Sequence, residues 1–219
     1  MAIVPNDHLG PWYHGAPVPF DAWRIPAPVS GTLREFDVPH SAVFLTTERT
    51  FAHVAGSHVA TSRLQTLDGV MQPIHRADHR SNLQSALART ELDRRSAWAQ
   101  ASANVWLSQG LFEGRALRFA PADDRAHREV LAEFVEQVKS TLVRAVSTGV
   151  VTNEVTHDQL TLAASHNLTR AWIEAVLSAV ELCGFRALMA HEWDGRSQRG
   201  IPWLAVRDTS MLSPPSWSA

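Results

Sequence analysis

The sequence predicts an α+β fold in which a β-rich body carries a long helical insertion. Three observations support this prediction. Prolines and glycines interrupt residues 1–75, whereas prolines nearly vanish and helical periodicity takes over between residues 80 and 183. Residues 184–213 then return to short apolar runs separated by a turn. Because no flexible linker separates these zones, we expect a single domain over residues 1–219.

Composition limits the classes of protein that remain. The hydrophobic share of 45% is enough for a packed core, and the formal net charge of -2 disfavours a dedicated nucleic-acid binder. Cys183 is the only cysteine, so an internal disulfide and a cysteine-rich zinc site are excluded. Its apolar setting, VELCGF, predicts a buried and unreactive thiol.

The same composition bears on location. The first residues, MAIVPNDHLG, lack the basic and apolar regions of a secretory signal, and no apolar run is long enough to span a membrane. We therefore expect a cytoplasmic protein without membrane contact, with export that needs no cleaved signal as the alternative.

Short apolar runs predict the strands of the β-rich body. PWYHG forms the first, SAVFLTT the second, and SRLQTL is a candidate for the third. TERTFAHVAGSHVA predicts a helix over residues 47–60, which Thr46 or Thr47 would cap and whose positive first turn suits Glu48. Near the C-terminus, GFRALMAHEW and IPWLAV predict two strands joined by the turn GRSQRG.

The insertion of about residues 80–183 is predicted to be helical throughout. A capping box at 81–84 opens one helix and another at 156–159 opens a short helix. Between them, apolar residues after Pro121 recur at spacings of three and four. The last helix ends at Gly184, a favourable C-cap. These apolar stripes predict core packing, and Trp98 and Trp106 are expected to belong to it, although a contact with substrate stays open.

The tripeptide Tyr13-His14-Gly15 is unusual at the end of a strand. An imidazole adds nothing to strand packing there, and glycine weakens a strand. A ligand that needs a hydrogen-bond donor and a close backbone approach would explain both residues. The alternative is a structural histidine that caps a turn.

The order of motifs adds a family resemblance. "YHG" comes first, "FLT" in Val43–Thr46 follows, and the next predicted helix supplies Phe51 and Ala52. This order resembles the ADP-ribosyltransferase superfamily, in particular the rifamycin-modifying ADP-ribosyltransferases and the poly(ADP-ribose) polymerase-like H-Y-E branch. The closing segment from GFRALMAHEW to MLSP is similar to that of ADP-ribosyltransferase domains in phage and mobile-element proteins. The resemblance covers roughly the first 60 and last 35 residues and implies a split β-sandwich.

The resemblance also implies an activity and a set of site residues. The activity is cleavage of NAD at the nicotinamide–ribose bond, through a transition state with oxocarbenium character. His14 would bind an NAD ribose hydroxyl, and Gly15 would give the cofactor room. Phe44 occupies the position of the family's nicotinamide-stacking aromatic residue, which is usually tyrosine. The residues implied at the cofactor are Tyr13, His14, Gly15, Phe44, Thr46 and Phe51.

A carboxylate is needed near the developing cation. Glu192 and Asp194, both in HEWDG, are the candidates, with Glu192 favoured. The predicted catalytic set is therefore His14, Phe44, Glu192 and Asp194, with NAD as substrate and no metal. His75 and His79 lie one helical turn apart, but the sequence offers no evident third metal ligand.

Three functions follow from these observations. The first is a mono-ADP-ribosyltransferase, whose acceptor the sequence leaves open among a protein, a nucleic acid and a small molecule. The second is an NAD glycohydrolase toxin, in which water is the acceptor. The third is a non-enzymatic interaction module, in which the helical region binds a partner.

Overall fold

A computed structural model gives the structure of most of the β-rich body and of parts of the insertion. It describes residues 6–25, 40–87, 89, 112–113, 116–117, 132, 136, 140, 170, 173–194 and 199–217. For residues 192–194 and 199–200 it describes the course of the backbone.

The described residues form short helices and nine strands. In chain order the labelled elements are η1 (Asn6–Leu9), β1 (Trp12–Ala16), β2 (Val43–Thr46), α1 (Arg49–Ala52), β3 (His58–Ser62), β4 (Val70–Met71), α2 (Ala77–Leu87), β5 (Phe112–Glu113), β6 (Ala116–Leu117), β7 (Ala187–Asp194), β8 (Arg199–Val206), η3 (Thr209–Met211) and β9 (Ser216–Trp217). Residues 173–182 form a further helix.

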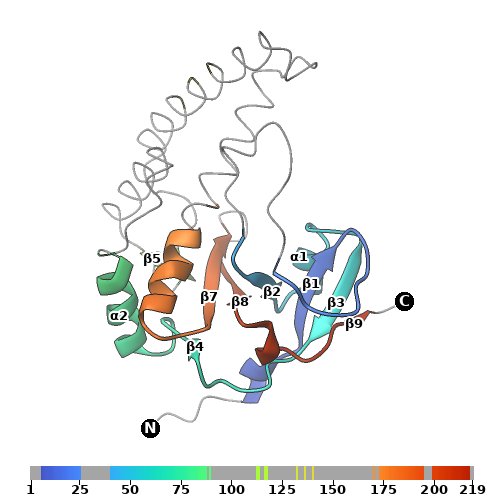
Figure 1. Ribbon diagram of the computed structural model, residues 1–219, viewed down its shortest axis with the longest axis horizontal. Coiled ribbons are helices and arrows are strands. Elements are labelled where there is room, and N and C mark those ends of the chain that lie inside the picture. The colour runs from blue at the N-terminus through green and yellow to red at the C-terminus, as the bar shows by residue number, and fades with distance from the viewer. Residues whose placement is uncertain are drawn as a thin grey trace.

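One mixed sheet organises the described part of the chain, in the order β5-β6-β7-β8-β2-β1-β3-β9. Most neighbours are antiparallel, whereas β4 and β6 both run parallel to β7. The helix over 173–182 and α2 lie at the β7 side, and α1 lies beside β1 (Figure 1). The predicted α+β class is therefore confirmed.

The sheet brings together segments that are far apart in sequence. β2 pairs with β8, so that Thr46 lies opposite Trp203, and β8 pairs with β7, so that Trp203 also lies opposite Ala190. β1 shares only one register pair with β2, Tyr13 with Thr46, but pairs with β3 along its whole length. β1 and β2 therefore have little pairing beyond Tyr13, and a cavity can form there.

One hydrophobic core lies where buried apolar residues of most strands meet. Trp12, Leu45, Ala60 and Leu204 are almost fully buried in it. Burying a leucine side chain such as that of Leu45 or Leu204 contributes roughly 1.5–3 kcal/mol relative to leaving it exposed.

Part of the first predicted helix is a strand. α1 ends at Ala52, and His58–Ser62 forms β3 instead of continuing the helix to residue 60. Val59 and Thr61 are β-branched and favour a strand, and pairing with β1 satisfies their backbone groups. The predicted cap is also wrong. Glu48 occupies the N-cap position without a side-chain bond to the helix.

Two other expectations need correction. α2 begins at Ala77, so the 81–84 sequence lies inside the helix, because Asp78 already supplies the negative charge that the first turn favours. In the insertion, β5 and β6 are short strands, and β6 pairs with β7. SRLQTL contributes only Ser62 to β3 and a single bridge, from Leu64 to Leu212.

Elsewhere in the insertion, residues 132, 136, 140 and 170 and the segment 173–182 are helical. The 156–159 capping box, Trp98 and Trp106 lie outside the described residues.

The predicted helix end at Gly184 is confirmed. Gly184 has a φ of 80°, and the amides of Gly184 and Phe185 donate to the carbonyls of Glu181 and Val180, a Schellman motif. The neighbouring Cys183 is only half-buried, which corrects the expectation of a buried thiol; partial burial raises the pKa of its thiol. In the described part of the chain, no helix combines the length and the apolar character needed to cross a bilayer.

Candidate functional site

His14 is held in one orientation by the neighbouring strand. Its Nδ1 lies 2.7 Å from the backbone oxygen of Phe44. A carbonyl oxygen only accepts, so Nδ1 carries the proton and donates it, which leaves Nε2 as the nitrogen that a ligand could reach. His14 and Phe44, the two members of the predicted catalytic set that come from β1 and β2, are therefore in direct contact.

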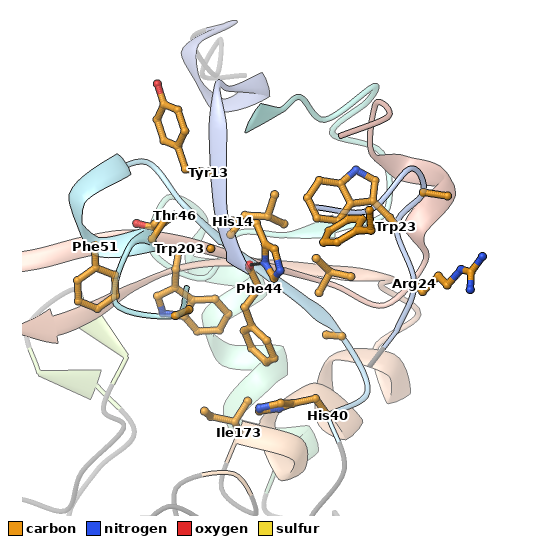
Figure 2. Close-up of a pocket in the computed structure, with 18 of the residues that line it drawn as sticks. Tyr13, His14, Trp23, Arg24, His40, Phe44, Thr46, Phe51, Ile173 and Trp203 are labelled. Atoms are coloured by element: carbon orange, nitrogen blue, oxygen red, sulfur yellow. Dashed lines mark hydrogen bonds between the residues drawn. The ribbon is translucent and has the colours of Figure 1, made fainter. Parts of the chain in front are cut away.

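The phenyl ring of Phe44 lies between two other ring systems. Its centroid is 5.0 Å from that of His40 and 6.0 Å from that of Trp203. In Figure 2 these rings gather below His14, with Ile173 from the neighbouring helix beside His40. β1, β2, β8 and the segment before β2 thus contribute rings to one cluster, and the helix over 173–182 contributes Ile173.

A loop that follows β1 forms the opposite side. Phe20 and Trp23 contact the His14 ring at centroid distances of 6.0 and 5.4 Å. Two tryptophan indoles tie this loop to the end of the described chain. Trp23 donates to the backbone oxygen of Ser213 at 2.7 Å, and Trp217 donates to that of Phe20 at 2.8 Å. The loop after β1, which forms this wall of the cavity, is therefore held in place by the C-terminal segment.

These elements enclose a cavity of about 860 Å³. This lies within the range of roughly 300–1,000 Å³ that is usual for small-molecule sites. The lining is mostly apolar and aromatic, and its charged members, Asp21 and Arg24, are exposed. Arg24 extends away from the ring cluster in Figure 2. The interior thus offers flat rings and imidazoles to a ligand, with charge at the mouth.

The structure gives Gly15 a local explanation. A Cβ placed there would lie 1.8 Å from the backbone oxygen of Ala52. Gly15 lines the cavity, but the space that its missing side chain leaves is taken by the end of α1. The glycine is therefore needed for α1 to pack on β1, whatever its backbone does at the cavity.

The remaining residues of the predicted cofactor set line the cavity in different ways. Phe51 of α1 is 38% exposed and lies at one side. Thr46 is buried, and its hydroxyl donates to the backbone oxygen of Pro202 at 3.0 Å and accepts from the amide of Glu48. Tyr13 is half-buried, and its phenol points away from the Phe44 and Trp203 rings (Figure 2).

The predicted carboxylates lie on β7. Glu192 pairs with Ile201 of β8 and Asp194 with Arg199. Glu192 is thus two positions along β7 from Ala190, which lies opposite Trp203 of the cavity. The side chains of residues 192–194 lie outside what the structure describes.

The other histidines singled out in the sequence lie elsewhere. His79 is buried against Phe185, and its Nδ1 accepts from the amide of Gln72 at 2.9 Å. His75 contacts His8 and His191, with ring centroids at 4.7 and 6.2 Å. Within the described ranges, no group of three His, Cys, Asp or Glu residues is arranged to hold a metal ion.

The sequence analysis missed most of the other residues that line the cavity, among them Phe20, Trp23, His40, Ile173 and Trp203. His40 could have been noticed, because it lies four residues before Phe44, in the segment that leads into β2. Trp203 and Ile173 depend on long-range pairing and packing, for which the sequence gives no local pattern.

The cavity thus combines an imidazole with one fixed tautomer and several rings in edge or tilted contact. The chain matches no protein-family model, and comparisons with curated proteins and with solved structures found no significant match.

Proposed function

We propose that the protein is a mono-ADP-ribosyltransferase with an ADP-ribosyltransferase-like split β-sandwich. It cleaves NAD at the nicotinamide–ribose bond and transfers ADP-ribose to an acceptor. The observation that carries the proposal is the contact between His14 and Phe44 at the wall of the cavity, where the Nδ1 bond to the Phe44 backbone fixes the tautomer of His14.

The cavity suits the parts of NAD. The phenyl ring of Phe44 offers a flat face to the nicotinamide, and stacking of this kind contributes about 0.5–1.5 kcal/mol beyond the burial of area. Nε2 of His14 binds a ribose hydroxyl. The mostly apolar lining lowers the local dielectric constant, which strengthens each electrostatic interaction with the developing cation.

The reaction needs negative charge close to the ribose. Glu192 supplies it in this proposal, with Asp194 as the alternative two residues further along β7. The pairing of β7 with β8 and of β8 with β2 supports this assignment, because it brings the backbone of Glu192 within two positions of the strand pair at Trp203.

The test combines binding with turnover. NAD should raise the melting temperature of the wild type, and incubation should release nicotinamide, measured by chromatography. His14→Ala should weaken NAD binding roughly tenfold or more, the loss expected for one hydrogen bond to a substrate. Glu192→Gln should bind NAD but lower the rate of nicotinamide release roughly 10²–10³-fold, as removal of a transition-state stabiliser does.

His58→Ala is the matched control, because His58 is an exposed histidine of β3 that does not line the cavity. A wild type that shows neither a thermal shift nor nicotinamide release would overturn the proposal and favour the interaction module. Labelled NAD separates transfer from hydrolysis. Label on a protein, nucleic acid or small molecule shows a transferase, and free ADP-ribose alone shows the glycohydrolase.

A further inference from the structure

His40 and Glu174 form a second polar pair at the cavity, on the other side of Phe44 from the His14 contact. His40 lines the cavity, and its ring makes a T-shaped contact with the Phe44 ring at an interplanar angle of 63°. Glu174 follows Ile173 at the start of the described helix over residues 173–182. Neither residue belongs to the set implied by the sequence.

The geometry gives the imidazole a carboxylate partner. Nδ1 of His40 lies 3.6 Å from Oε1 of Glu174, and the two side chains are only 26% and 17% exposed. The same Oε1 accepts from the backbone amide of Ser41 at 3.0 Å, which fixes the carboxylate next to His40. Within the described part of the chain, Nδ1 of His40 is buried and makes no hydrogen bond.

The separation of 3.6 Å is slightly longer than a hydrogen bond. Catalytic hydrogen bonds are often long before substrate binds and shorten in the complex. A small rotation of either side chain would let Nδ1 donate its proton to Glu174, and Nε2 of His40 would then carry the lone pair. An imidazole oriented by a carboxylate is the arrangement that activates weak nucleophiles in hydrolases.

We propose that His40 is the general base that activates an O–H acceptor, with Glu174 as its positioning residue; this rests on the proposed NAD-cleaving function. The acceptor is water or an alcohol. Its oxygen attacks C1′ of the nicotinamide ribose while its proton passes to Nε2 of His40. The C1′–N bond breaks, and its electron pair leaves with neutral nicotinamide. His40 later returns the proton to solvent, so the reaction yields one proton in total.

The position of Phe44 supports separate roles for His14 and His40. Its backbone oxygen fixes His14 and its ring contacts His40, so one residue separates a ribose-binding imidazole from an acceptor-activating one. The charged lining residues Asp21 and Arg24 are exposed, which leaves Glu174 as the described carboxylate that approaches His40. The predicted carboxylates on β7 stabilise the cation and are not required as the base.

The first experiment replaces the base. His40→Ala should lower the rate of nicotinamide release in water roughly 10²-fold. It should lower equally the rate at which the methyl riboside forms when methanol is added as a probe alcohol. This is the usual contribution of one general base. The thermal shift by NAD should remain. Added imidazole should restore part of the rate to His40→Ala, and His58→Ala should behave as the wild type.

The second experiment tests the positioning residue. Glu174→Gln should lower kcat roughly tenfold with little change in KM for NAD, and Glu174→Asp should recover part of the loss. In the His40→Ala background the same Glu174→Gln change should have little further effect on kcat, because its action passes through His40. If Glu174 had only a structural role, Glu174→Gln would lower kcat by the same factor in the wild type and in His40→Ala.

The outcomes separate this inference from the proposed function. Full activity in His40→Ala, or a lost activity that imidazole does not restore in a folded variant that still binds NAD, would overturn the role of His40 and leave the NAD site standing. A wild type that binds NAD but releases no nicotinamide in water or methanol would overturn O–H activation alone. A wild type that does not bind NAD removes both proposals.

Discussion

Two regions of the sheet, one around β1 and β2 and one around β7, use the same kinds of residue for different purposes. In the β1–β2 region, His14 and Phe44 line an open cavity, and one nitrogen of the imidazole is committed to a backbone oxygen. In the β7 region, His79 also uses Nδ1 in one backbone hydrogen bond, but it is buried in packed helix and loop. What distinguishes a candidate ligand-binding histidine from a structural one is the space that its second nitrogen faces.

The contrast extends to the apolar residues. The β7 region buries Leu188 and Leu177 completely, whereas Phe44 is only half-buried and its ring stands in the cavity wall. A protein interior is close-packed, so side chains in the first group are expected to determine stability. The rings of the second group leave an opening and are expected to determine binding.

The largest expected effect is a loss of folding stability when a buried side chain of β7 is shortened. Leu188→Ala should lower the free energy of unfolding by about 4 kcal/mol, because it leaves a cavity in a fully enclosed site. The milder change in the β1–β2 region, Phe44→Leu, should cost only about 1 kcal/mol, since the ring already borders empty space. Urea unfolding of both variants measures the difference. Equal losses would mean that the two regions are packed alike.

The next effect concerns the contact between α1 and β1. Gly15→Ala should destabilise the protein by about 3 kcal/mol, because its methyl group would overlap the Ala52 carbonyl and displace α1 from the cavity wall. Gly184→Ala is the control. A Cβ there meets nothing within 4 Å, so only the cost of a positive φ remains, about 1–2 kcal/mol. A neutral Gly15→Ala would show that α1 is not held as described.

The smallest expected effect is a pH dependence of the folding stability, which arises from histidines near β7. Burial, followed by the neighbouring His75 and His8, lowers the pKa of His191 below its ordinary value of 6.5, and burial and Arg76 lower the pKa of His79. The unfolded chain therefore binds protons that the folded chain does not. The stability should be fully present above pH 6.5 and should fall as the pH decreases toward 5.

Melting temperatures between pH 7 and pH 5 measure this dependence. His191→Gln should reduce it to the part that arises from His79, and His58→Gln should leave it unchanged. A melting temperature that rises on acidification would contradict the lowered pKa values.

Much of the sheet could be predicted from local pattern. VFLT, ALMAHEW and IPWLAV are apolar runs bounded by turn residues, and the structure confirms β2, β7 and β8 there. The stop at Gly184 was predictable because few other residues adopt a positive φ readily. β3 was not predictable, because HVATS follows a helix start closely and only its pairing with β1 decides between helix and strand.

The candidate site was predictable in part. His14 and Phe44 could be paired in advance through the order of their motifs, and the structure brings them into contact. His40 and Trp203 join them through packing and through the register of β2 on β8, which depend on residues far away in sequence. The role of Gly15 could not be inferred, because a glycine that accommodates a helix and one that accommodates a ligand look the same in sequence.

The position of the indoles gives the cavity an intrinsic reporter. Trp23 and Trp203 line it from opposite sides, while Trp12 is 1% exposed in the core. Any molecule that fills the space comes within contact of two fluorophores that the protein already contains. Quenching of their emission would then measure occupancy directly, with no label and no assumption about which reaction follows.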